Sequence, residues 1–194
     1  RKLLAILLSL AMLFTLLPPG AAMAADERSI LVGDIALTGS ADSPAYAITV
    51  NGAVQSGDYE QNYNIKWDGS TLTLANAVIT TSDTYAISYS FGGNLCIELI
   101  GNNQVTTTSG NGTGIYVSGS SPHLTISAQT ENPRLEVTAK QNGILSWGGS
   151  LTIESGTIVV NGGSNGGIVA EEDIAIKGGT ITATSDRMAI SAAD

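Results

Sequence analysis

Two aromatic residues in the second half of the chain, Tyr116 and Trp147, have the chemistry needed to hold a sugar. Sugar rings present apolar C–H faces that stack on aromatic rings, while nearby hydroxyl groups satisfy their polar edges. Leu145 lies two residues before Trp147, and Ser88 occupies the position in an earlier segment that corresponds to Tyr116 and Leu145. We therefore predict that Tyr116, Leu145, Trp147 and Ser88 form a carbohydrate-binding surface. The alternative is that these side chains only support one another on a sheet surface.

A second candidate site is acidic. Glu171, Glu172 and Asp173 are consecutive and fall in a predicted turn. Carboxylates combined with turn carbonyls suit Ca²⁺, which takes 6–8 oxygen ligands. We therefore expect a calcium ion as a candidate cofactor at this corner. The competing interpretation is a solvated turn with no bound ion.

Catalytic chemistry finds little support in the sequence. His123 is the single histidine, and no acidic residue is close to it in sequence. Glu98 and Glu136 offer the two carboxylates that glycoside hydrolysis needs, but they fall on different runs of the repeat described next. A polysaccharide lyase needs a basic proton acceptor and cations over the substrate carboxylate, and no such cluster is evident. We therefore predict no enzymatic activity.

An internal repeat determines where these candidate residues lie. A unit of three short runs, each alternating apolar and polar residues and separated by Gly, Ser, Asn or Asp, recurs five times. The first runs are 70–74, 94–97, 123–126, 150–153 and 173–176; the second are 78–80, 105–107, 135–137, 158–160 and 181–183; the third are 86–89, 114–117, 143–146, 167–170 and 189–192.

This repeat predicts an all-β fold, a right-handed, single-stranded parallel β-helix with three short strands per coil. Alternation with period two points one set of side chains inward and the other outward. A β-sandwich also uses many short strands, but it does not require the same three-run unit to recur.

The alternation also assigns individual side chains to the inside or the outside of the coil. Ile126, Ile153 and Ile176 hold one inward slot in successive coils and should form a buried ladder. Two outward ladders are expected, one of first-run residues (Thr73, Cys96, Thr125, Thr152 and Ala175) and one of third-run residues (Ser88, Tyr116, Leu145, Val169 and Ser191).

The N-terminus has the features of a secretory signal peptide. Arg1 and Lys2 precede an uncharged apolar run over 3–17, helix-breaking residues follow, and Ala22-Met23-Ala24 supplies a cleavage signal. The apolar run is short of the roughly 20 residues needed to span a bilayer. We therefore expect a secreted or cell-surface protein with no membrane span after cleavage. The expected organisation is a signal peptide over 1–24, an irregular N-terminal cap over 25–68, and a β-helix over 69–194 that is truncated at its C-terminal end.

The charge of the chain excludes one class of partner, and its cysteine content excludes an intrachain disulfide. The chain has 17 acidic and 8 basic residues, a net charge of −9, and signal cleavage would make it −11. Nucleic-acid binding needs clustered Lys and Arg, so it is excluded. Cys96 is the single cysteine, so no intrachain disulfide can form.

The run Asn62–Leu74, the opening 33–39, and the repeated Leu-Thr-Ile and Gly-Ile units resemble the carbohydrate-binding β-helix domains of clostridial (Firmicutes) secreted and surface proteins. The resemblance covers roughly 31–194. It implies a parallel β-helix that binds polysaccharide of plant cell-wall or host type, with Ca²⁺ in the better-known relatives that hold cellulose and pectate. No catalytic motif transfers. The alternative functions are an adhesin-type structural stalk that binds proteins and, third, a polysaccharide lyase-like enzyme.

Overall fold

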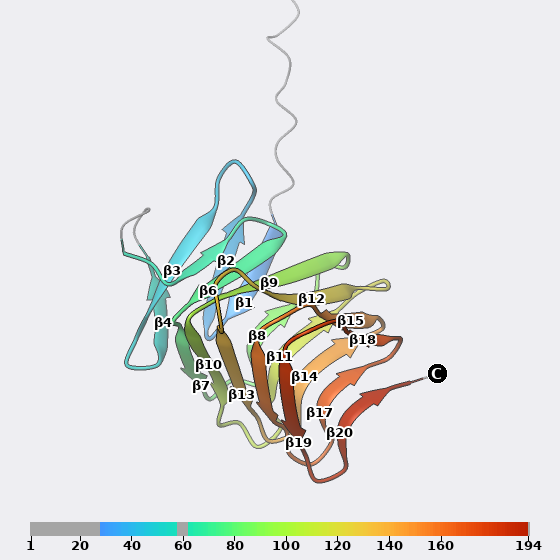
Figure 1. Cartoon of the computed structure of the whole chain (residues 1–194). Helices are drawn as coiled ribbons and strands as arrows, with labels where there is room; N and C mark the ends of the chain where they lie inside the picture. Colours follow the sequence, from blue (N-terminus) through green and yellow to red (C-terminus); the bar gives the residue numbers. More distant parts are fainter. Residues whose placement is uncertain (1–27, 58–61, 194) are drawn as a thin grey trace, which may run out of the picture.

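The computed structural model describes residues 28–57 and 62–193, and its secondary structure there is entirely β (Figure 1). The expected signal peptide over 1–24 lies outside the described residues. Within those residues no helix is long and apolar enough to cross a membrane. Residues 71–192 form five stacked coils of three strands each, so the predicted parallel β-helix is confirmed.

Each coil contributes one strand to each of three sheets, which we call face 1, face 2 and face 3 in the order that the chain visits them. Face 1 contains β6 (Thr71–Ala75), β9 (Asn94–Ile100), β12 (His123–Ala128), β15 (Ser150–Ile153) and β18 (Ile174–Ile176). Face 2 contains β7 (Val78–Thr81), β10 (Asn102–Thr107), β13 (Arg134–Thr138), β16 (Thr157–Asn161) and β19 (Thr180–Thr184). Face 3 contains β8 (Tyr85–Tyr89), β11 (Thr113–Ser118), β14 (Asn142–Trp147), β17 (Gly166–Ala170) and β20 (Met188–Ala192).

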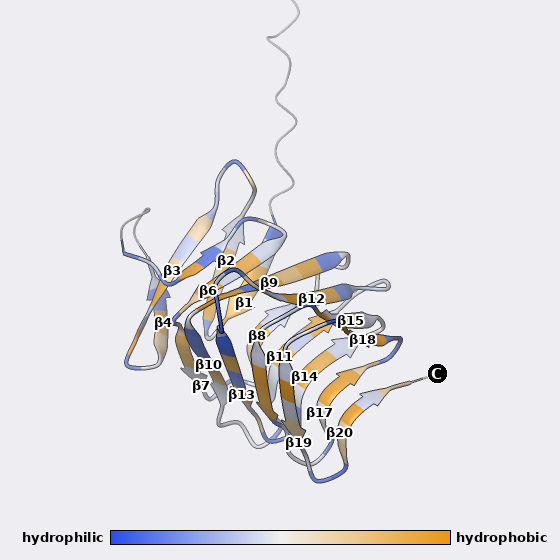
Figure 2. Cartoon of the chain, viewed as in Figure 1, coloured by the Kyte–Doolittle hydropathy of each residue, from blue (hydrophilic) through white to orange (hydrophobic). Residues whose placement is uncertain are grey.

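Parallel pairing joins every coil to the next, which excludes the β-sandwich. On face 3, Tyr116 pairs with Ser88 on one side and Leu145 on the other, and Leu145 pairs with Val169. This is the outward ladder that the alternation predicts. Apolar and polar residues alternate along the stacked strands in Figure 2, and the inward set forms one continuous buried core.

The residues before the first coil form antiparallel strands at its exposed edges. These are β1 (Arg28–Val32), β2 (Ile35–Gly39), β3 (Ala45–Val50), β4 (Ala53–Ser56) and β5 (Ile65–Trp67). Strand β1 pairs with β8 on face 3, and β5 pairs with β6 on face 1. The Trp67 side chain is fully buried, and its Nε1 donates a hydrogen bond to the Arg28 carbonyl oxygen at 2.7 Å. Strands β1 and β5 therefore pair with strand edges that a solenoid would otherwise leave unpaired.

The predicted register on face 1 is wrong at the first coil. Thr71, rather than Thr73, pairs with Cys96, and Thr73 pairs with Glu98. Strand β9 has three buried inward residues, Leu95, Ile97 and Leu99, and β6 pairs Leu72 and Leu74 with the second and third of them. A two-residue shift leaves every side chain on the same side of the sheet, so the alternation could not reveal it.

Two other residues differ from their expected exposure. Ile176 pairs with Ile153 in the predicted slot, yet it is 48% exposed while Ile153 is fully buried, since no described strand stacks on β18. Thr152 holds its expected outward slot beside Thr125 but is buried. The His123 side chain accounts for this burial, because its Nε2 lies 3.0 Å from Thr152 Oγ1.

Candidate functional site

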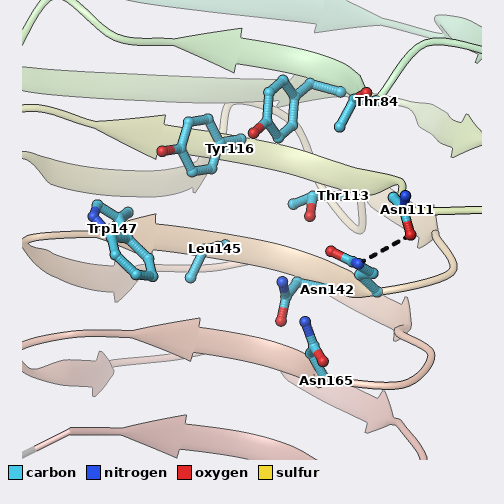
Figure 3. A pocket seen from close by; sticks show the side chains of 10 residues that line it. Thr84, Asn111, Thr113, Tyr116, Asn142, Leu145, Trp147 and Asn165 are labelled. Atoms are coloured by element: carbon cyan, nitrogen blue, oxygen red, sulfur yellow. Dashed lines mark hydrogen bonds between the residues drawn. The ribbon is translucent and has the colours of Figure 1, made fainter. Parts of the chain in front are cut away.

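A groove of about 510 Å³ lies on face 3 (Figure 3). This volume is in the range of natural ligand sites. The groove crosses β8, β11 and β14, together with the turns that lead into β11, β14 and β17. Its lining residues are Thr84, Tyr85, Asn111, Thr113, Tyr116, Gln141, Asn142, Leu145, Trp147 and Asn165.

Aromatic and apolar side chains line one part of the groove. Tyr116 and Leu145 face outward from paired positions of β11 and β14, and Trp147 occupies the next outward position of β14. The Trp147 side chain is 54% exposed, so its ring is open to a ligand. The ring of Tyr85 stacks on that of Tyr116, with centroids 4.5 Å apart and planes inclined by 12°. The groove therefore has flat apolar surfaces on three successive coils.

Amide side chains line the opposite part of the groove, near the starts of the strands (Figure 3). Gln141 Nε2 donates a hydrogen bond to Asn111 Oδ1 at 3.4 Å. The Asn142 side chain is only 7% exposed, and it makes no hydrogen bond to any described residue. Its amide is directed into the groove, where a ligand could supply the missing partners. Asn165, on the next coil, is exposed.

Glycines at the start of face 3 allow this arrangement. Gly114 and Gly143 follow Thr113 and Asn142 directly, where each strand leaves the corner. A Cβ at Gly114 would lie 2.3 Å from Val137 Cγ1 and 2.6 Å from the Gly143 carbonyl oxygen. A larger residue would force the coils apart, so the glycines permit the close backbone packing that directs the neighbouring polar side chains outward.

The lining of the groove is electrically neutral. None of its ten residues is Asp, Glu, Lys, Arg or His. Glu171 is not among the lining residues, and its Oε2 accepts a hydrogen bond from the backbone N–H of Gly148, next to Trp147, at 3.0 Å. The groove can therefore stack on flat apolar surfaces and exchange neutral hydrogen bonds, but it offers no charged group to a ligand.

Comparison with known proteins gives a family for this chain. A family model described as a carbohydrate-binding domain-containing protein matches residues 42–194. The chain belongs to this family. No curated protein and no solved structure is significantly similar to it. The matched region contains the whole groove, and the predicted kinship with clostridial carbohydrate-binding domains is confirmed at the level of the family.

The fold of this carbohydrate-binding protein brings together three of the four residues predicted to contact sugar. Tyr116, Leu145 and Trp147 all line the groove, whereas Ser88 does not. Ser88 pairs with Tyr116 on one side but with Leu31 of β1 on the other, so it lies toward the N-terminal strands. Whether these residues bind sugar remains a prediction.

Sequence reasoning missed Tyr85 and the amide residues. Tyr85 directly precedes the third run 86–89, so the alternation did not include it in the outward ladder. The amide residues had a signal in the sequence, because Asn or Gln lies within three residues before the Gly-Ile of three third runs, at Asn111, Gln141-Asn142 and Asn165. That signal was not distinguishable from the general preference of turns for Asn.

The acidic corner at Glu171, Glu172 and Asp173 lies between β17 and β18. Glu172 Oε2 accepts a hydrogen bond from Ser150 Oγ at 3.0 Å, while Glu171 is held by Gly148 as described above. In the part of the chain that the structure describes, no group of three or more His, Cys, Asp or Glu side chains is placed to hold a metal ion. The calcium hypothesis therefore still rests on the sequence.

The other candidate catalytic groups lie away from the groove. Glu98 is on face 1, where Gln129 Nε2 donates a hydrogen bond to it. Glu136 is on face 2, where Arg134 forms an ion pair with it at 3.0 Å. These two carboxylates are therefore on different sheets, as the sequence predicted, and His123 is engaged with Thr152 on face 1.

Proposed function

We propose that this chain is a secreted or cell-surface, non-catalytic polysaccharide-binding protein whose ligand occupies the groove on face 3. One observation carries the proposal. The exposed Trp147 ring and the stacked Tyr85–Tyr116 pair share a groove with amides that have unused hydrogen-bonding capacity. Aromatic rings suit the apolar faces of sugar rings, and amides suit their hydroxyl groups.

The arrangement of the groove favours an extended glycan that runs along the solenoid axis. Parallel strands are about 4.8 Å apart, so the three steps from β8 to β17 cover about 14 Å. Lining side chains recur on each of these coils, which offers similar contacts to successive sugar units. Affinity should therefore rise with oligosaccharide length until the groove is filled and then level off.

Binding without cleavage is supported by the groove's chemistry. Hydrolysis of a glycosidic bond uses a pair of carboxyl groups, and a lyase uses a general base with cationic assistance. The ten lining residues contain no carboxylate, imidazole or amine. Incubation with a bound polysaccharide should therefore release no reducing sugar and no unsaturated product.

Removal of single aromatic rings tests the proposed site. Tyr116→Ala and Trp147→Ala should each weaken binding by about 1–2 kcal/mol, a loss of roughly 5- to 30-fold, by analogy with aromatic pair energies. Phe91→Ala is the matched control, because Phe91 is 64% exposed but does not line the groove. Affinity electrophoresis and calorimetry should be read beside thermal melting. If the groove variants melt lower yet bind normally, the aromatics are structural and the sugar site lies elsewhere; a protein-binding stalk then becomes the better interpretation.

The proposed location rests on the signal-peptide features of residues 1–24. Expression of the full chain in a bacterial host should release a protein that begins at Ala25, which mass spectrometry of the culture medium can identify. Retention of residues 1–24 on a membrane-bound product would contradict cleavage.

A further inference from the structure

We infer that, unlike the relatives that hold pectate, this chain has a groove on face 3 that selects neutral polysaccharides and discriminates against polyuronates. This inference rests on the proposed function, since it specifies the class of glycan that the same groove binds. Three features support it: the neutral lining, the mixed donor and acceptor character of that lining, and the charges around its rim.

The lining offers donors and acceptors together. An Asn or Gln side chain has an NH₂ that donates and a carbonyl oxygen that accepts, and Tyr and Thr hydroxyl groups do both. Sugar hydroxyl groups also do both, so a neutral glycan can satisfy every lining group. An ionised carboxylate only accepts, so it leaves the amide oxygens facing negative charge.

The Asn142 side chain needs both a donor and an acceptor from the ligand. Its side chain is more than nine-tenths buried and has no hydrogen-bond partner among the described residues. Neither end of this amide has a partner among the described residues, so a ligand that satisfies both ends supplies a donor as well as an acceptor. A hydroxyl group at this point meets the need, while a carboxylate satisfies only the NH₂.

The charges in and around the groove also disfavour a polyuronate. A carboxylate that leaves water needs a cation or several donors to compensate its lost hydration, and the lining provides no cation. Lys140 directly precedes Gln141, and Arg187 directly precedes β20, but both are exposed and neither lines the groove. Asp83 and Asp186 lie at comparable places in the turns, so the local charges offset one another. The net charge of −9 repels a polyanion at longer range.

Matched pairs of polysaccharides that differ only at C6 provide the test. Polygalacturonate, polymannuronate and C6-oxidised cellulose are each compared with the carboxyl-reduced or unoxidised polymer, using the full chain at physiological ionic strength. Each titration is run in EDTA and again with Ca²⁺. The neutral member of a bound pair should bind about tenfold more tightly or better. Equal or tighter binding of an acidic member, with or without Ca²⁺, overturns the inference but leaves the proposed function intact. Failure of every polymer to bind overturns the proposed function, and the inference with it.

A charge-introducing variant tests the physical cause. Asn165 is exposed at the amide end of the groove, so Asn165→Lys should fold normally while adding a cation to the lining. Its preference for the neutral member should fall several-fold, because the ammonium compensates the uronate charge. Asn165→Gln keeps the lining neutral, so any change in affinity should be the same for both members of a pair and their ratio should stay as in the wild type. An unchanged preference in Asn165→Lys would contradict the electrostatic explanation.

Discussion

The ring of Tyr85 stacks on the ring of Tyr116 across neighbouring coils of face 3, with centroids 4.5 Å apart and planes inclined by 12°. Tyr116 is half-buried, and this contact restricts the orientations that its ring can adopt. A ring that is already fixed loses less conformational entropy when a ligand stacks on it. Tyr85 therefore preorganises the groove as well as lining it.

Replacing Tyr85 tests whether its ring contributes to binding. Tyr85→Ala removes the stack and should weaken polysaccharide binding by about 1 kcal/mol, roughly fivefold. Tyr85→Phe keeps the aromatic ring that makes the stack, so its affinity should stay within about twofold of that of the wild type. Calorimetric titration of both variants with one oligosaccharide measures the difference. Wild-type affinity in Tyr85→Ala would show that the stack has no part in recognition.

The two tryptophans give an independent optical measurement of the site. Trp67 is fully buried, whereas Trp147 is 54% exposed in the groove. Ligand binding should shift the fluorescence emission to shorter wavelength, since it removes water from the Trp147 ring alone. The Trp147→Phe variant should emit at shorter wavelength before any ligand is added and should show no shift on titration. A ligand-dependent shift that persists in Trp147→Phe would place the sugar elsewhere.

Much of the fold could be predicted from the sequence because a β-helix repeats one local rule. Alternation in each run placed Tyr116 and Leu145 on the same outward ladder, and the structure pairs them. The alternation of inward and outward residues leaves two features of the fold undetected. It cannot detect a two-residue slip, as at Thr73 and Glu98, because parity is unchanged. It also cannot tell an inner coil from a terminal one, which is why Ile176 was expected to be buried.

The groove itself was only partly predictable. Its aromatic side follows from outward positions within strands, which alternation identifies. Its amide side depends on residues at the corners, such as Asn142 and Asn165, where the chain bends and the alternation stops. Side-chain direction at such a corner is determined by the backbone packing around glycines like Gly143. That packing involves residues from other coils and could not be read from local sequence.

The calcium hypothesis has a direct thermal test. An ion held by Glu171, Glu172 and Asp173 would stabilise the folded state by about 2.7 kcal/mol at a Ca²⁺ concentration 100 times its Kd. Glu171 and Glu172 each accept one hydrogen bond, from Gly148 and Ser150, which leaves further lone pairs for an ion. If calcium binds there, the Tm should be higher in Ca²⁺ than in EDTA, and equal Tm values would contradict the hypothesis. A Ca²⁺-dependent rise in Tm that is abolished by Asp173→Asn would establish the ion at this corner.

The Cys96 thiol reports on the exposure of face 1. The side chain is half-buried, with its Sγ 3.8 Å from Ser127 Oγ, and burial raises the pKa of the thiol. A raised pKa lowers the thiolate fraction at neutral pH, and the thiolate is the reactive form. A disulfide reagent should therefore label the folded protein more slowly than the unfolded protein, and the rate should climb steeply with rising pH. Complete protection until denaturation would mean that another part of the chain covers face 1.

The final prediction uses two isoleucines that hold the same slot in successive coils. Ile153 is fully buried and Ile176 is 48% exposed, although the two pair directly in register. Ile153→Asp places a charge without a partner in the core, which should cost more than about 4 kcal/mol and melt neighbouring coils together. Ile176→Asp leaves its carboxylate in water and should cost about 1 kcal/mol or less. Because the substitution and the slot are the same, the difference measures the contribution of stacking by the next coil. Urea unfolding followed by circular dichroism gives both values, and equal losses for the two variants would contradict the core register described here.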